Sequence, residues 1–137
     1  MANVFLSSTF DKRDFVERIE RTLQRRGHSV FVDRGDLAPG TSWADTVRGA
    51  ISNTDLFVTV ASHPRPDSDH ALNVELGAAW SLGKPIVALV FPGVRAETAL
   101  PLPHTDYQVV PVEGRSDEEI ATAILTKVPE QATNAAS

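Results

Sequence analysis

Hydrophobic positions along the chain follow two patterns, one typical of buried strands and one typical of amphipathic helices. Short apolar runs predict strands at residues 4–8, 30–33, 56–62, 86–91 and 107–112, the last at a sheet edge. Between them, apolar residues recur every three or four positions and predict helices at residues 11–26, 43–53, 70–82 and 117–128. The run Ile86–Phe91 lacks polar alternation, which indicates a strand covered on both faces.

Local signals mark where these helices begin and end. Gly27 stands at the position that closes the first helix, and Gly83 with the following Lys-Pro pair closes the third. The sequence Ser116-Asp-Glu-Glu119 is typical of a capping box and opens the last helix. Residues 92–106 are rich in proline, so we expect a long surface connection there.

The order of the elements predicts an α/β fold. The strands are joined through helices rather than by tight turns, which implies right-handed crossovers and a parallel sheet. We predict a flavodoxin-like three-layer sandwich, with a five-stranded parallel sheet of order 2-1-3-4-5. Residues 1–129 form one domain in this prediction, and residues 130–137 are a flexible tail or linker remnant. The ligand crevice of such a sheet lies at the carboxyl ends of strands one and three.

Composition narrows the classes of function. With 137 residues, the chain is long enough to form a core without a metal ion or a disulfide. It has no cysteine, so disulfides and thiolate chemistry are excluded. A net charge of −5 argues against nucleic acid as a direct partner. The longest apolar run is too short to span a bilayer, and the first residues lack the basic start of a secretion signal. We therefore expect no membrane partner and a cytoplasmic location.

Glu75 is the most informative residue, because it is the only charged one between Asp69 and Lys84. Helical periodicity places it within an apolar stripe made of Leu72, Leu76, Ala79 and Leu82. One interpretation is a first-turn glutamate stabilised by the helix dipole. The other is a functional carboxylate, favoured because the strand order brings the start of this helix to the ligand crevice.

Hydroxyl groups follow the first strand, where a nucleotide-binding fold often carries a phosphate site. Ser7, Ser8 and Thr9 offer hydroxyls to a phosphate or a ribose, or else one of them caps the first helix. The segment has neither a G-x-G-x-x-G motif nor a P-loop, so we expect no tightly bound cofactor. In the next loop, Asp33 and Asp36 are either turn residues or contacts to a ribose or a partner.

Other polar and aromatic residues carry weaker signals. His63, Asp67, Asp69 and His70 crowd one segment without a recognised ligand spacing, so we expect no metal site. Trp43 opens a helix beside a Pro-Gly turn and is a candidate pocket residue, whereas Trp80 is expected in the core. The Arg25-Arg26 pair is interpreted as the cationic end of a helix.

Four segments in order resemble the boxes of a bacterial-type TIR (Toll/interleukin-1 receptor) domain, from Val4 to about Phe91 and more weakly through the last helix. The matching segments are Val4–Ser8, then Phe31–Asp33 with Leu37–Gly40 and Trp43, then Asp55–Ser62, and finally Glu75-Leu76 with Gly83–Ile86. In the family these are the first strand, the second strand with its BB loop, the third strand, and the helix of the catalytic glutamate.

The resemblance implies that Glu75 cleaves the nicotinamide glycosidic bond of NAD, giving ADP-ribose or a cyclic isomer. It also implies self-association through the BB-like segment Arg34–Ser42 and a signalling role in bacterial immunity. The short polar tail suggests a sensor domain in a longer protein. The residues that would bind NAD as substrate are Ser7, Ser8, Thr9, Phe10, Asp33, Asp36, Leu37, Trp43 and Ala71. The chain departs from the family at Ser8 and Ala71, where enzymatic members often carry aromatics.

Two alternatives stay open on the sequence. The segment Glu75–Val87 is also similar to nucleoside deoxyribosyltransferases, which use a glutamate on an N-glycosidic bond but act on neutral bases and generally need an extra acid. The second alternative is a TIR interaction module without catalysis, which the missing aromatics favour.

Overall fold

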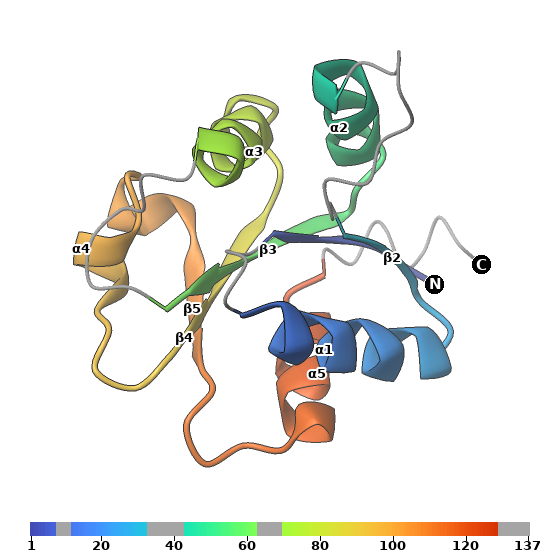
Figure 1. Cartoon of the computed structure of the whole chain (residues 1–137), viewed down its shortest axis with the longest axis vertical. Coiled ribbons are helices and arrows are strands. Elements are labelled where there is room, and N and C mark those ends of the chain that lie inside the picture. The colour runs from blue at the N-terminus through green and yellow to red at the C-terminus, as the bar shows by residue number, and fades with distance from the viewer. Residues whose placement is uncertain (8–11, 33–42, 63–69, 129–137) are drawn as a thin grey trace.

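The computed structural model of the chain describes residues 1–7, 12–32, 43–62 and 70–128. The strands are β1 (Asn3–Ser7), β2 (Ser29–Val32), β3 (Leu56–Ala61), β4 (Ile86–Val90) and β5 (Gln108–Pro111). The helices are α1 (Arg13–Arg25), α2 (Trp43–Ser52), α3 (His70–Ser81), α4 (Ala96–Ala99) and α5 (Asp117–Leu125). The strands form one parallel sheet of order β2-β1-β3-β4-β5, with β5 at an edge (Figure 1). The predicted fold class and strand order are confirmed.

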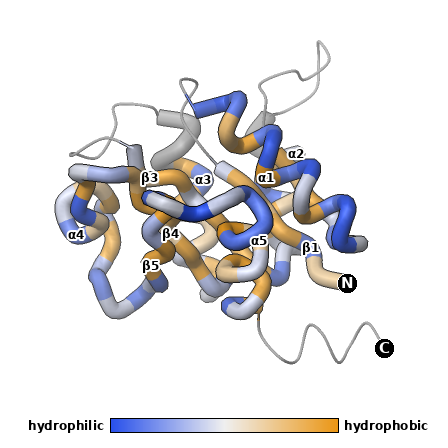
Figure 2. Tube along the Cα trace, turned by 90° about the horizontal axis from the view of Figure 1, so that it is seen from below, coloured by the Kyte–Doolittle hydropathy of each residue, from blue (hydrophilic) through white to orange (hydrophobic). Residues whose placement is uncertain are grey.

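Alternate residues of each central strand face opposite layers of helices. Val4 and Leu6 of β1 pack in a cluster with residues of α1 and α5, whereas Phe5 packs with residues of α2 and α3. Strands β3 and β4 are buried along their whole length, as their continuous apolar sequences predict. The two helical layers lie on opposite sides of the sheet in Figure 1, and segments of the strands carry the hydrophobic colour in Figure 2.

Local signals set the ends of several helices. Gly27 after α1 and Gly83 after α3 have φ values of +86° and +69°, a conformation that costs glycine no steric strain. In both places the amide after the glycine donates to a carbonyl of the last helical turn, the long bond of a Schellman motif. Ser116 and Glu119 form the predicted capping box at the start of α5. These predictions from sequence are confirmed.

The connection at residues 92–106 contains more structure than we expected. It holds the short helix α4 and a 3-10 turn at His104–Asp106. Ala96 and Ala99 of α4 are buried in the same apolar cluster as residues of α2 and α3. Tertiary burial therefore supports a helix of four residues that would not form alone.

Trp80 in α3 and Leu82 just after it are exposed, whereas the sequence predicted that both are buried. Trp80 is 47% exposed rather than buried, and its indole Nε1 donates to Asp106 Oδ2 at 2.8 Å. The physical reason is angular, because Trp80 lies roughly 90° around the helix from the buried stripe of Glu75, Leu76 and Ala79. Leu82 is also exposed, since it follows the last helical residue at the point where the chain turns away.

Candidate active site

A hydrogen bond joins the end of β1 to α3 across the interior of the protein. The Ser7 hydroxyl donates to Glu75 Oε1 at 2.6 Å. Ser7 is the last residue of β1, and it shares the parity of Phe5, whose side chain faces the α2 and α3 layer. Glu75 comes to the same place from the second turn of α3, on the face that also buries Leu76 and Ala79. The inward position predicted for Glu75 is confirmed.

Both partners of this hydrogen bond are buried. Ser7 is 2% exposed and Glu75 is 3% exposed, and Glu75 is the one buried charged side chain among the residues that the structure describes. The 2.6 Å oxygen–oxygen distance falls in the range of charge-assisted hydrogen bonds, in which a hydroxyl donates to a carboxylate. The geometry therefore suits a carboxylate whose charge is stabilised by a donor aimed at it.

The position of Glu75 in its helix decides between the two interpretations of this residue. Helix α3 begins at His70, so Glu75 is past the first turn, and that turn contains no acidic residue. The helix dipole acts within the first turn, so it is not what holds this carboxylate. The helix-dipole interpretation is wrong, and the Ser7 hydroxyl is a partner that the sequence did not reveal.

A second hydroxyl lies on the neighbouring strand at the same level. Thr59 of β3 pairs with Ser7 of β1 in the sheet register, and Ala88 of β4 pairs with Thr59. Thr59 shares the parity of Phe57 and faces the same helical layer, and it is buried. Sequence analysis missed Thr59. Its only signal was a hydroxyl within the apolar strand Leu56–Ala61, and threonine is common in strands for reasons of packing alone.

Most of the other predicted site residues lie outside the part of the chain that the structure describes. Ser8, Thr9, Phe10, Asp33, Asp36 and Leu37 lie outside the described residues, as does the BB-like segment 34–42. Trp43 is the first residue of α2 and Ala71 the second of α3, but their side chains also fall outside the described part. The structure thus brings Ser7 together with Glu75 and leaves the remaining substrate contacts as predictions.

Two further findings concern the described residues alone. None of their helices combines the length and the apolar character needed to cross a membrane. No cluster of three or more histidine, aspartate or glutamate side chains suited to a metal ion occurs among them. The segment that suggested a metal site, from His63 to Asp69, is outside this part of the chain.

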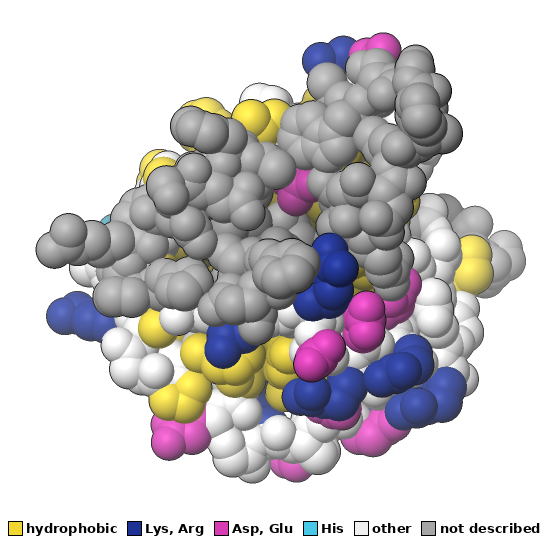
Figure 3. All heavy atoms as spheres, viewed as in Figure 1, with side chains coloured by type: hydrophobic (Ala, Val, Ile, Leu, Met, Phe, Trp, Pro, Cys, Tyr) yellow, Lys and Arg dark blue, Asp and Glu magenta, His cyan; other side chains and the backbone are white. Residues whose placement is uncertain are grey.

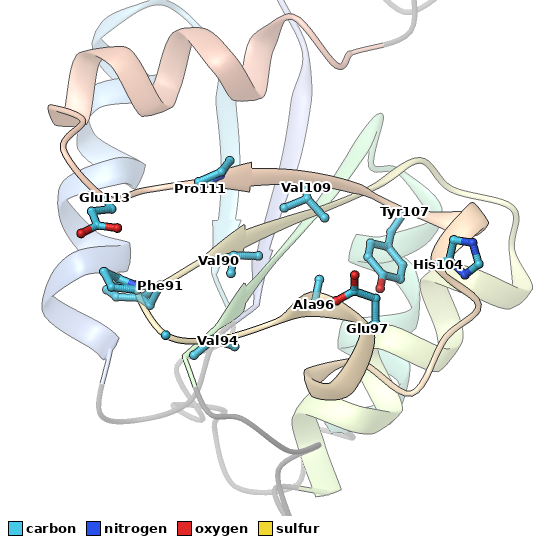
Figure 4. A pocket seen from close by; sticks show the side chains of 12 residues that line it. Val90, Phe91, Val94, Ala96, Glu97, His104, Tyr107, Val109, Pro111 and Glu113 are labelled. Atoms are coloured by element: carbon cyan, nitrogen blue, oxygen red, sulfur yellow. The ribbon is translucent and has the colours of Figure 1, made fainter.

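A cavity of about 500 Å³ lies elsewhere, between the end of β4, helix α4 and β5 (Figure 4). Tyr107 and Glu97 point toward one another on its wall. Burial, and to a smaller extent the Glu97 carboxylate, raises the pKa of the Tyr107 hydroxyl above its ordinary value. Neither Ser7 nor Glu75 lines this cavity. The Glu75 region is the stronger candidate site, because its buried carboxylate has a hydrogen-bond donor aimed at it.

Comparison with known proteins assigns the family. The profile of the TIR domain matches residues 4–125. The chain belongs to the TIR domain family. A comparison with curated protein sequences found no match. The matched residues include Ser7, Thr59 and Glu75, so the Glu75 region lies within the TIR domain.

Several solved structures share the fold. A metazoan TIR-STING receptor from C. gigas has 20% identity and a TM-score of 0.66, covering 88% of this chain and 39% of that one. The TIR domains of the activated Roq1 resistosome have 18% identity and a TM-score of 0.61, covering 99% and 78%. The CMP N-glycosidase BcmB of Clostridium botulinum has 21% identity and a TM-score of 0.57, covering 88% and 96%. At these identities the similarity establishes the fold alone.

Proposed function

We propose that this TIR domain cleaves the N-glycosidic bond between nicotinamide and ribose in NAD, with Glu75 as the catalytic carboxylate. The observation that carries the proposal is the buried Glu75 carboxylate at the carboxyl end of β1, held by the Ser7 hydroxyl at 2.6 Å. In a doubly wound sheet, this is where the crossovers diverge and where ligands bind. Buried, specifically paired carboxylates in such a crevice are candidates for catalysis.

The chemistry of NAD suits a site with a single carboxylate. The nicotinamide nitrogen is already cationic in the glycoside, so it leaves with the bonding electron pair as a neutral base and needs no general acid. The anomeric carbon becomes oxocarbenium-like in the transition state, and a nearby carboxylate stabilises that positive charge. Water then adds its oxygen to the anomeric carbon and loses a proton, which gives ADP-ribose. If a hydroxyl or ring nitrogen of the same molecule attacks instead, the product is a cyclic isomer.

The hydrogen bond from Ser7 has a clear role in this proposal. A glutamate side chain has several rotatable bonds, and catalysis by charge requires the charge to be held in place before the reaction begins. The hydroxyl restricts the carboxylate and stabilises its charged form. We therefore assign Ser7 as a positioning residue for Glu75, besides the substrate contact predicted from sequence.

The remaining parts of the proposal concern assembly and context. We propose that activity requires self-association through TIR–TIR contacts that include Arg34–Ser42, and that a sensor domain in a longer protein triggers it. The activated resistosome with similar TIR domains supports assembly as the route to activation. We further propose a signalling role in the cytoplasm, with NAD as substrate and no tightly bound cofactor.

A second candidate function is the hydrolysis of a nucleotide N-glycosidic bond to a neutral base. The similarity in fold to a CMP N-glycosidase favours it. A neutral base is a poor leaving group unless it is protonated, so this reaction generally needs a second acid. Glu75 is the one buried charged side chain in the described part of the chain, which makes NAD the better match.

The test is incubation of the purified chain with NAD, and in parallel with CMP, followed by mass spectrometry of the products. The protein should be assayed both dilute and clustered on a surface, because assembly is part of the proposal. We expect release of nicotinamide from NAD. Release of cytosine from CMP without cleavage of NAD would select the second candidate. No cleavage of either substrate in the clustered state would reject catalysis and favour a TIR interaction module.

Glu75→Gln should lower the rate of NAD cleavage by at least about a hundredfold, because the carboxylate charge acts directly on the transition state. Glutamine is preferred to alanine because its amide oxygen can still accept from Ser7, whereas Glu75→Ala would leave that buried hydroxyl without this partner. Circular dichroism and urea unfolding check that the fold is retained.

Glu97→Gln is the matched control, since it makes the same substitution at the cavity beside Tyr107. We expect it to leave the rate of NAD cleavage unchanged. If Glu97→Gln removed activity and Glu75→Gln did not, the reactive site would be the β4–β5 cavity instead.

A further inference from the structure

Buried hydroxyl groups in the described part of the chain divide into two sets. Ser7 donates to Glu75, Thr22 donates to the carbonyl of Arg18 at 2.8 Å, and Thr54 donates to the carbonyl of Asn3 at 3.4 Å. The hydroxyls of Thr59, Ser62 and Tyr107 are buried without a hydrogen-bond partner among the described residues. Of these three, Thr59 is the one that pairs with Ser7 in the sheet register, and it is 1% exposed.

An unpartnered buried hydroxyl costs free energy, so its presence needs an explanation. Valine has nearly the same shape as threonine and would fill the same space without burying an unpartnered polar group. The hydroxyl of Thr59 therefore contributes no hydrogen bond to the fold in this state. This separates Thr59 from Thr54, whose hydroxyl links the start of β3 to β1.

The position of Thr59 connects it to the reactive carboxylate. Thr59 is the register partner of Ser7, and neighbouring strands of a sheet lie about 4.8 Å apart. The side chains of Ser7 and Thr59 both face the layer of helices that contains α3 and Glu75. A carboxylate accepts several hydrogen bonds, so one that is bound to Ser7 keeps acceptor sites for a further donor on the adjacent strand.

We propose that Thr59 is a second positioning residue for Glu75, donating to its carboxylate when substrate occupies the crevice. This inference rests on the proposed function. With two donors from adjacent strands, the carboxylate is fixed in direction as well as in place. A fixed direction matters most in the transition state, where the positive charge develops at one carbon atom of the ribose. In this proposal, the hydroxyl that has no partner within the fold acts on the carboxylate during the reaction.

The experiment compares Thr59→Val, which removes the hydroxyl, with Thr59→Ser, which keeps it. Urea unfolding, kcat and KM for NAD are measured for both variants. We expect Thr59→Val to unfold at the same urea concentration as the wild type or at a higher one. Its kcat should fall about tenfold with KM unchanged, as expected for an interaction made in the transition state. Thr59→Ser should retain most of the wild-type kcat.

Thr54→Val is the matched control, because it removes a buried threonine hydroxyl that does have a partner. We expect it to unfold at a lower urea concentration and to keep the wild-type kcat. If Thr59→Val were destabilised in the same way, its hydroxyl would serve the fold and the inference would be overturned.

The kinetic outcomes separate this inference from the proposed function. An active wild type with an equally active Thr59→Val would overturn the role of Thr59 alone. A rise in KM with kcat unchanged would mean that Thr59 binds substrate rather than positions Glu75, and would also overturn it. A wild-type protein that does not cleave NAD in the clustered state would overturn the proposed function, and this inference with it.

Discussion

The two faces of the sheet differ in the side chains that are buried against them. The face covered by α1 and α5 meets an apolar cluster of aliphatic and aromatic side chains. The face covered by α2 and α3 is also largely apolar, but it contains Ser7, Thr59 and the buried carboxylate of Glu75. Buried polar groups and charges cost stability unless they are partnered. Among the described residues, the buried charge lies on the α2 and α3 side alone, whereas the α1 helix buries Thr22 with its hydroxyl bonded inside the same helix.

The outer surface of α1 and α5 differs from that of α3. Ion pairs link α1 to α5, with Arg18 3.3 Å from Asp117 and Arg26 2.6 Å from Glu118. Charged side chains gather over the α1 region in the space-filling view (Figure 3). The third helix instead exposes Val74 and Trp80.

Removing a large side chain next to each face gives the largest expected effect. Ile124→Ala and Leu76→Ala each delete a fully buried aliphatic group, one beneath α5 and one beside Glu75. Each should lower the free energy of unfolding by about 2 to 5 kcal/mol, measured by urea unfolding. Only Leu76→Ala should also lower kcat for NAD, because it loosens the helix that carries Glu75. Equal losses of kcat in both variants would contradict the division between the two faces.

Ser7→Ala should have a smaller effect, confined to the α3 face. It removes the hydrogen bond to the Glu75 carboxylate and should lower kcat by about 10- to 100-fold, the effect of one hydrogen bond to a charged group. Steady-state kinetics with NAD measure this effect. Ser52→Ala is the control, since Ser52 is exposed and its hydroxyl bonds only within α2. An active Ser7→Ala variant would mean that the carboxylate needs no positioning by this residue.

The smallest expected effect is a pH dependence on the α1 and α5 face. The hydrogen bond from Arg26, aided by Arg25, lowers the pKa of Glu118 below its ordinary value of 4.5. A carboxylate with a lowered folded-state pKa adds stability above pH 4.5, and this stability is lost as the pH falls through the lower value. The urea midpoint of the wild type should therefore exceed that of Glu118→Gln at neutral pH, and the gap should close in acid.

Salt gives a second check on the Glu118 pair. Because the pair is exposed, added salt at neutral pH should narrow the gap between the two proteins. A gap that persisted in strong acid would have to come from packing rather than charge. Loss of the Glu118 pair should not alter the rate of NAD cleavage, since α1 and α5 lie on the other side of the sheet from Glu75.

Much of the fold was predictable because its signals are local. Periodicity identified the main helices and strands, Gly27 and Gly83 marked two helix ends, and the capping box marked the start of α5. The alternation of strands and helices predicted a parallel sheet, and the common flavodoxin-like order for five such strands was confirmed. The short helix α4 was missed, because its stability comes from buried contacts with distant elements.

The candidate site was only partly predictable. A single charge in an apolar helical stripe indicated an inward carboxylate, and the structure confirms that position for Glu75. Its hydrogen bond to Ser7 joins residues 68 positions apart, and no local pattern encodes such a pair. The register that sets Thr59 beside Ser7 depends in the same way on how two strands align.

The amino-acid sequence by itself determined the α/β class, the TIR membership and the inward direction of Glu75, and it pointed to the strand order through a common fold pattern. These properties follow from periodicity, turn residues and the order of motifs, which can be read along the chain without knowing which distant segments meet. Only the tertiary structure decided that Glu75 is held by Ser7, that Thr59 lies beside them, and that Trp80 is exposed. Those outcomes depend on which faces meet when distant segments pack, and that is a property of the assembled sheet and its helices.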